Sequence, residues 1–138
     1  MAIKQISIYL ENKTGTISDI ANLLSENDIN MFSMCIADTK DFGILRIVAS
    51  DTEKAAEIIK NAGHTFNVRE IVCFSIPDKT GSLANVLRIF KDNDINIEYM
   101  YALPNNVVGS AFIAARVNDN DKTEEILKEK GIDVLNAL

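Results

Sequence analysis

Hydrophobic and polar positions change their period in a fixed order along the first half of the chain. Residues 3–10 alternate between apolar and polar side chains, a pattern typical of a half-buried strand. The apolar positions that follow recur at the spacing of one helix face: Ile17, Ile20, Ala21 and Leu24. Strands at 30–38 and 43–49, a helix at 51–62 and a strand at 64–69 complete the order β-α-β-β-α-β.

The second half of the chain repeats this order. Residues 12–31 align with residues 78–97 at a constant lag of 66 residues, and seven of the twenty aligned positions are identical. Such self-similarity indicates a tandem duplication. We therefore predict two domains, residues 1–70 and 71–138, with no flexible linker between them.

Each half has the element order of the ferredoxin-like unit, an antiparallel four-stranded sheet with two helices on one face. The predicted fold class is therefore α+β. Alternation along the strands places several apolar side chains on the face opposite the helices, among them Phe32, Met34, Met100 and Phe112. Because a large apolar surface is unfavourable in water, we expect that face to be covered, within the chain or by another copy.

Composition narrows the class of protein. The 138 residues are 47% hydrophobic and 25% charged, which is typical of a folded globular protein. The net charge of −6 opposes binding to nucleic acid and to anionic membranes. The sequence shows neither a signal peptide nor a membrane-spanning run, so we expect a cytoplasmic protein. Cys35 and Cys73 have no second ligand at zinc spacing, and we expect reduced packing residues, no metal and no cofactor.

Residues suited to catalysis are few. The chain has one histidine, His64, and no serine or cysteine lies in a recognisable nucleophile elbow. The carboxylates lie at helix starts and in turns, where they complement helix dipoles. Lys13-Thr14-Gly15 and its copy Lys79-Thr80-Gly81 lack the remaining glycines of a phosphate loop. We therefore predict a protein that is not an enzyme.

The repeated turn holds one glycine before the first helix of each half, Gly15 and Gly81. A glycine at a helix start lets the backbone come close to a ligand, and the uncommitted N–H groups of the first turn suit a carboxylate. The same glycine also suits a tight connection between strand and helix. The residues alone leave both interpretations open, since duplication copies structural and functional residues alike.

The repeated motifs resemble those of the ACT domain family. Its signature is Asp-x-x-Gly-x-Leu entering the first helix and His/Asn-Gly/Asp-Ile-Asn-Ile entering the second strand. The first half carries Asn12-Lys13-Thr14-Gly15-Thr16-Ile17 and Asn27-Asp28-Ile29-Asn30-Met31. The second half is the closer match, with Asp78-Lys79-Thr80-Gly81-Ser82-Leu83 and Asn93-Asp94-Ile95-Asn96-Ile97. The resemblance covers nearly the whole chain.

The resemblance implies an arrangement and a place for a ligand. ACT domains commonly pair side by side into a continuous eight-stranded sheet and bind small molecules, usually amino acids, at the interface between paired domains. The ligand contacts the loop before the first helix of one domain and the second strand of its neighbour. By position, the candidate ligand-binding residues are Asn12, Lys13, Thr14, Gly15, Thr16, Ile17, Asn30, Met31, Phe32, Asp78, Lys79, Thr80, Gly81, Ser82, Leu83, Asn96, Ile97 and Glu98.

Chemistry then suggests a role for each group. Backbone N–H groups near Gly15 and Gly81 would bind the carboxylate of an amino acid. The side-chain oxygens of Asn12 or Asp78 would hold the loop or receive the ammonium group. The pocket walls would be apolar: Ile17, Leu83, Met31 or Phe32. Because Asn12 replaces the family's aspartate, we expect the two sites to differ in affinity.

Three functions remain under comparison. The first is a free-standing sensor that binds an L-amino acid between the two repeats, forms a homodimer and regulates an enzyme in trans. The alternative is a non-catalytic protein-interaction or regulatory subunit with no retained ligand site. The third is a small enzyme of ferredoxin-like fold that depends on His64.

Overall fold

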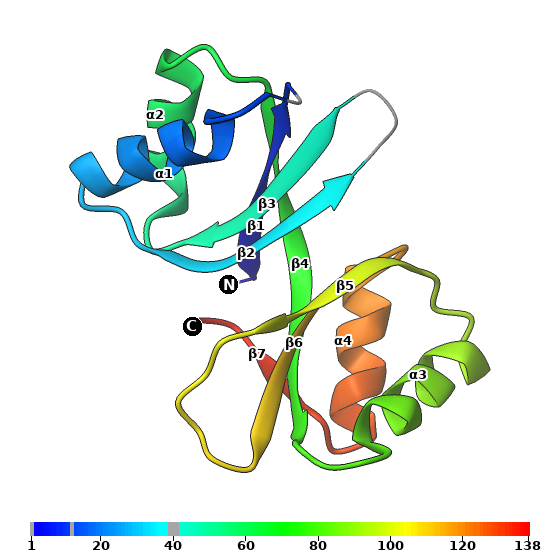
Figure 1. Cartoon of the computed structure of the whole chain (residues 1–138). Coiled ribbons are helices and arrows are strands. Elements are labelled where there is room, and N and C mark those ends of the chain that lie inside the picture. Colours follow the sequence, from blue (N-terminus) through cyan, green and yellow to red (C-terminus); the bar gives the residue numbers. More distant parts are fainter. Residues whose placement is uncertain (1, 12, 39–41) are drawn as a thin grey trace. The chain divides into compact units, whose positions relative to one another are not determined.

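The computed structural model describes residues 2–11, 13–38 and 42–138. These ranges contain four helices and seven strands (Figure 1). In chain order they are β1 (Ile3–Leu10), α1 (Thr16–Glu26), β2 (Met31–Asp38), β3 (Gly43–Ala49), α2 (Thr52–Asn61), β4 (Phe66–Pro77), α3 (Ser82–Asp92), β5 (Ile97–Leu103), β6 (Ser110–Val117), α4 (Asn120–Glu129) and β7 (Asp133–Leu135). The chain divides into two compact units, Lys4–Glu70 and Ile71–Leu138, and Ala2 and Ile3 group with the second.

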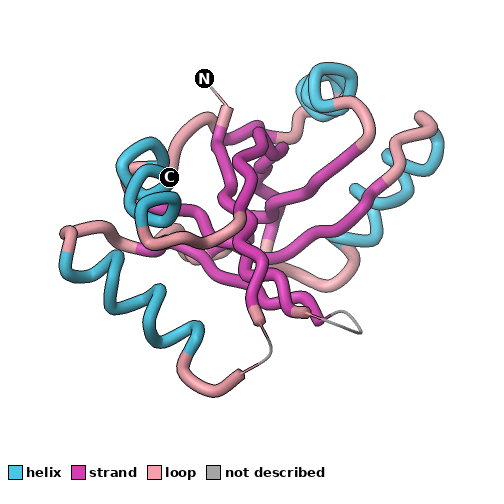
Figure 2. Tube along the Cα trace, turned by 90° about the horizontal axis from the view of Figure 1, so that it is seen from above, coloured by secondary structure: helices cyan, strands magenta, loops and turns pink. Residues whose placement is uncertain are grey.

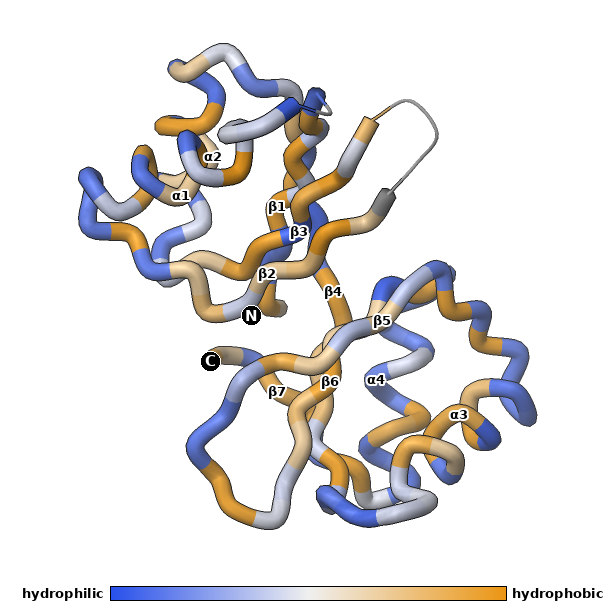
Figure 3. Tube along the Cα trace, viewed as in Figure 1, coloured by the Kyte–Doolittle hydropathy of each residue, from blue (hydrophilic) through white to orange (hydrophobic). Residues whose placement is uncertain are grey.

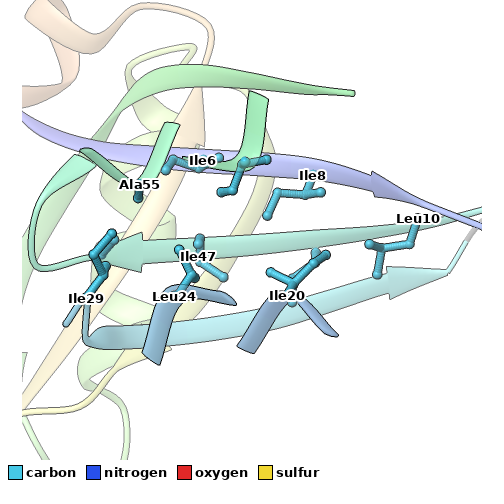
Figure 4. Packing of buried hydrophobic residues seen from close by; sticks show 11 residues of the cluster. Ile6, Ile8, Leu10, Ile20, Leu24, Ile29, Ile47 and Ala55 are labelled. Atoms are coloured by element: carbon cyan, nitrogen blue, oxygen red, sulfur yellow. The ribbon is translucent and has the colours of Figure 1, made fainter. Parts of the chain in front are cut away.

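The first unit, Lys4–Glu70, is a sheet with both of its helices on one face. Its strand order is β2-β3-β1, followed by the first part of β4, and β1 and β3 pair antiparallel with Ile8 opposite Leu45. Apolar side chains from β1, β3, α1 and α2 form its core (Figure 4). Ile8, Ile20 and Leu24 are fully buried there, which explains the helix-face spacing seen in the sequence.

The second unit, Ile71–Leu138, repeats this layout. Its strand order is β5-β6-β4, with β7 paired to the other side of β4. Its core joins β4, β6, α3 and α4 and contains an edge-to-face pair of Phe74 and Phe90, whose ring centroids lie 5.9 Å apart. Each unit follows the predicted order β-α-β-β-α-β, and Figure 2 shows its helices, strands and loops along the trace.

The prediction of eight strands is wrong for the residues that the structure describes. The sequence predicts one strand at 64–69 and a separate strand at the start of the second half, whereas residues 66–77 form one strand, β4, which contributes to both units. The cause lies in the sequence between the two segments, Asn67-Val68-Arg69-Glu70, which contains no glycine or proline to end an extended segment. The second part of β4 is mostly apolar, at residues 71–74 and 76, whereas the segment at 67–70 is mostly polar (Figure 3).

The predicted position of two methionines on the face opposite the helices is also wrong. Met34 lies opposite Ile47, and Met100 lies opposite Ala115. Directly opposite residues share a face of a sheet, and both partners belong to the cores under the helices. The pairing shifts between Met31 and Ser33, and again between Ile97 and Tyr99. Such a bulge reverses the alternation of every side chain that follows it.

Candidate functional site

Two of the four helices begin at a glycine. Gly15 precedes α1 and Gly81 precedes α3, with φ of 94° and 91°, and neither helix start has a side-chain cap. By contrast, α2 and α4 begin after Asp51 and Asp119, whose carboxylates accept the N–H of Lys54 and Lys122 at 3.1 Å. The first-turn N–H groups of α1 and α3 therefore lack the carboxylate partner that the other two helices have.

The space at the Gly81 corner is open. A side-chain carbon added at Gly81 would meet no atom within 4 Å. The corner opens on a cavity of about 660 Å³, a volume within the range of small-molecule sites. The cavity is lined by Ser75, Ile76, Pro77, Lys79, Thr80, Gly81, Ser82, Asn85, Val86, Gly109, Ser110, Gly131, Ile132 and Asp133. All of these residues belong to the second unit.

At the equivalent end of the first unit, the cavities lined by described residues are smaller. One of about 480 Å³ is lined by Tyr9, Leu10, Glu11, Lys13, Thr16, Phe42, Gly63, His64 and Thr65. Another of about 350 Å³ is lined by Leu10, Glu11, Lys13, Thr16, Ile17, Ile36 and Gly43. The rings of Tyr9 and Phe42 form an edge-to-face pair with centroids 5.8 Å apart. The equivalent positions in the second unit hold Ser75 and the fully exposed Val108, so no ring pair stands beside Gly81.

A hydroxyl group at the start of each helix distinguishes the two corners further. In the first unit, the hydroxyl of Thr16 donates to the carbonyl oxygen of Lys13 at 3.2 Å. In the second unit, the hydroxyl of Ser82 is buried without a hydrogen-bond partner, although the Ser82 N–H donates to the Lys79 carbonyl oxygen at 3.2 Å. An unpaired buried hydroxyl costs about 1–3 kcal/mol. The Gly81 corner therefore holds an unused polar group at the edge of its cavity.

Comparison with known proteins identifies the family. The model of the ACT domain pair matches residues 1–137. The chain belongs to the ACT domain family. A crystal structure of protein BT0572 from Bacteroides thetaiotaomicron is 40% identical, with a TM-score of 0.90 over 98% of this chain and 92% of that one. Comparison with curated proteins found no match.

Structures of lower identity share the ACT fold. The ligand-free regulatory subunit of aspartate kinase from Thermus thermophilus is 12% identical, with a TM-score of 0.69 over 94% of this chain and 93% of that one. Aspartokinase III of E. coli, in complex with lysine and aspartate, is 13% identical, with a TM-score of 0.52. The match covers 93% of this chain and 31% of the kinase.

The structure places part of the predicted ligand-binding set at the two glycine corners. Lys79, Thr80, Gly81 and Ser82 line the cavity of the second ACT unit, and Lys13, Thr16 and Ile17 line those of the first. Asp78 and Leu83 do not line the 660 Å³ cavity, and Thr14 and Gly15 are exposed beside the smaller ones. Asn12 lies outside the described residues.

The predicted strand residues lie at the other end of each ACT unit. Asn30, Met31 and Phe32 follow the C-terminal end of α1, an 11-residue helix about 16 Å long. Asn96, Ile97 and Glu98 have the equivalent place after α3. The N–H groups of Asn30 and Asn96 donate to the side chains of Ser50 and Asn118 at 3.0 Å, and Glu98 pairs with Arg116. Within one unit, these residues do not line the glycine corner.

The asparagine in front of each second strand ends the preceding helix. The side chain of Asn27 donates to the Leu23 carbonyl oxygen, and that of Asn93 donates to the Ile89 carbonyl oxygen, both at 2.8 Å. Asp28 and Asp94 follow with φ of 58° and 56°, a left-handed conformation that aspartate tolerates in turns. This half of the ACT signature therefore has a structural role in both units.

Several lining residues were missed from the sequence. Ser75, Asn85, Ser110 and Asp133 come from four separate elements or connections that meet beside Gly81. The antiparallel order gives the signal that could have found them, because the end of β4, the start of α3, the start of β6 and the start of β7 lie at one end of the sheet. The sequence prediction named residues of the glycine loop and of the second strand of each half, and these four residues belong to neither.

Two further residues with reactive side chains, His64 and Cys73, belong to different units. His64 lines the 480 Å³ cavity of the first unit. No group of three histidine, cysteine, aspartate or glutamate residues among those described could hold a metal ion. Burial, with a smaller contribution from the negative charge of Glu124, raises the pKa of the Cys73 thiol to about 12. A thiol with that pKa is a poor nucleophile at neutral pH.

No helix within the described ranges is both long enough and apolar enough to cross a bilayer.

Proposed function

We propose that this ACT domain pair is a non-catalytic regulatory module that binds a free L-amino acid at the Gly81 corner. The observation that carries the proposal is the start of α3, where a helix without a side-chain cap opens on a cavity of about 660 Å³. The N–H groups of a first helical turn and the positive end of the helix dipole bind carboxylates. Glycine at this position leaves the approach to them free of a side chain.

The relatives support a regulatory role. One structure of similar fold is the regulatory subunit of an aspartate kinase, and another, aspartokinase III, was solved with lysine and aspartate. We further propose that the present chain acts in the cytoplasm as a homodimer and regulates an enzyme in trans. The residues that follow α3, Asn96, Ile97 and Glu98, would then complete a ligand site on a paired domain. The Gly15 corner would be the weaker site, because the Tyr9 and Phe42 rings stand beside it.

A second candidate function is protein interaction without a ligand. Met34 and Ile36 on β2 have 49% and 51% of their surface exposed, and β2 ends the strand order of its unit. An exposed apolar edge strand is suited to pairing with another chain. This function would be favoured if a protein partner bound equally well with and without amino acids and lost its binding to the double variant Met34→Ser/Ile36→Ser.

Calorimetric titration with a panel of the common L-amino acids tests the first proposal. We expect at least one amino acid to bind. Gly81→Asp should weaken its binding by about a hundredfold, because the new carboxylate takes the place of the ligand's carboxylate at the helix start and repels it. Gly15→Asp is the matched control, because it makes the same change at the equivalent turn. It should leave binding at the Gly81 corner unchanged. Absence of binding to the whole panel, or full affinity in Gly81→Asp, would contradict the proposal.

A further inference from the structure

The charges of the side chains that line the 660 Å³ cavity cancel. Among the described residues that line it, Lys79 and Asp133 carry a charge, one of each sign. Lys79 belongs to the loop before α3, on the side of the helix N-terminus. Asp133 begins β7, which pairs with β4 so that Asp133 lies opposite Ser75. The sheet therefore fixes the backbone position of Asp133 at the cavity.

This balance defines the chemical class of the ligand. We propose that the ligand is a zwitterionic α-amino acid whose own side chain is uncharged, and that Asp133 accepts its ammonium group; this rests on the proposed function. The helix start and Lys79 match the carboxylate, and Asp133 matches the ammonium. The other lining residues, such as Ser75, Asn85, Ser110 and Ile132, are neutral. A charged ligand side chain would lose water there without gaining an opposite charge.

Asp133 suits the ammonium better than the aspartate in the family signature does. Asp78 does not line the cavity, and its N–H donates to the carbonyl oxygen of Gly109 at 2.9 Å. That bond holds the loop before α3 against the residue that precedes β6. Asp78 therefore shapes the corner, whereas Asp133 is placed to contact a ligand in it.

The buried hydroxyl of Ser82 supplies an independent sign of a missing partner. It lies on the first residue of α3 and lines the cavity, and it has no hydrogen bond. Serine rotates freely about one bond between staggered positions, so this hydroxyl can turn to a carboxylate bound at the helix start. Thr16, its equivalent in the first unit, is already bonded to Lys13.

The first unit does not reproduce this arrangement. Thr65 stands where the second unit has Asp133, and the charged residues at its cavities, Glu11 and Lys13, pair with each other at 3.6 Å. The chain thus contains its own comparison site without the ammonium acceptor. It also supplies a natural replacement residue, threonine, for position 133.

A selectivity measurement on full-length protein tests the inference. The probes are the L-amino acid that binds best and its 2-hydroxy acid analogue, which has no ammonium group. The wild type should prefer the amino acid by about tenfold to a hundredfold, the range for a hydrogen bond to a charged group. Asp133→Asn and Asp133→Thr should lose this preference. Asp78→Asn, which removes the same charge from the same unit, should keep it.

The outcomes separate the two proposals. If the wild type binds an amino acid and both Asp133 variants, folded by their melting curves, retain the preference, the assignment of Asp133 is overturned while the proposed function stands. A best binder with a charged side chain, such as lysine or aspartate, would overturn the ligand class alone. If the wild type binds no amino acid, the proposed function fails and this inference fails with it.

Discussion

The two glycine corners share a backbone and differ in the side chains around it. Gly15 and Gly81 have nearly the same φ, and both precede helices without a side-chain cap. Around Gly81 there is a cavity of about 660 Å³, a buried unpaired hydroxyl and Asp133. Near Gly15 the cavities lined by described residues are smaller, and two aromatic rings pack together. The two copies therefore share the backbone of the helix start and differ in the side chains around it.

The cores under the two corners differ in the same way. Ile8 and Leu24 in the first unit are replaced by Phe74 and Phe90 in the second, and all four are fully buried. The aromatic pair packs in the same core as Val86, which also lines the cavity. The second core therefore supports the helix whose start forms the proposed site.

The largest expected effect comes from removing part of this core. Phe90→Ala should lower the free energy of unfolding by about 3–5 kcal/mol, because it leaves a cavity and breaks the aromatic pair. Leu24→Ala, at the equivalent position of the first unit, should cost about 2–5 kcal/mol. Chemical denaturation measures both, and calorimetry should find weaker amino-acid binding in Phe90→Ala alone. Equal losses of affinity in the two variants would show that the site does not belong to the second unit.

A smaller effect separates the structural and the binding roles of the glycines. Gly15→Ala and Gly81→Ala should each cost about 1–2 kcal/mol of stability, since φ is positive at both and an added carbon meets no atom within 4 Å. The two thermal denaturation curves should therefore shift alike. Binding should weaken in Gly81→Ala and remain unchanged in Gly15→Ala. A much larger stability loss at one glycine would mean that the two turns are not equivalent.

The effect that is smallest at neutral pH concerns Cys73, which occupies the position of Ser7 in the first unit. Its pKa in the folded protein, about 12, lies above the ordinary value of 9.0, so the unfolded chain releases this proton first as pH rises. Stability should then fall by about 1.4 kcal/mol per pH unit across this interval. Denaturation of the wild type and of Cys73→Ser at several alkaline pH values isolates the contribution. If the free energy of unfolding changed with pH in the same way in both proteins, the predicted contribution of Cys73 would be refuted.

The sequence predicts local features better than those that depend on distant contacts. Apolar spacing located the helices, and Gly15 and Gly81 do open α1 and α3. The continuous β4 was missed because the repeat places a boundary at residue 70, although no glycine or proline there ends the extended segment. The bulges at Met31 and Ile97 were missed because they arise from pairing with a second strand. Asp133 was missed because it reaches the corner through β7, more than 50 residues after Gly81.

A crystal structure of the protein grown with its best-binding amino acid tests the central claim most directly. The account predicts ligand density in the cavity beside Gly81, with the carboxylate at the start of α3 and the ammonium group at Asp133. An amino acid bound with its carboxylate away from α3, or an empty Gly81 corner at a saturating concentration, would contradict it.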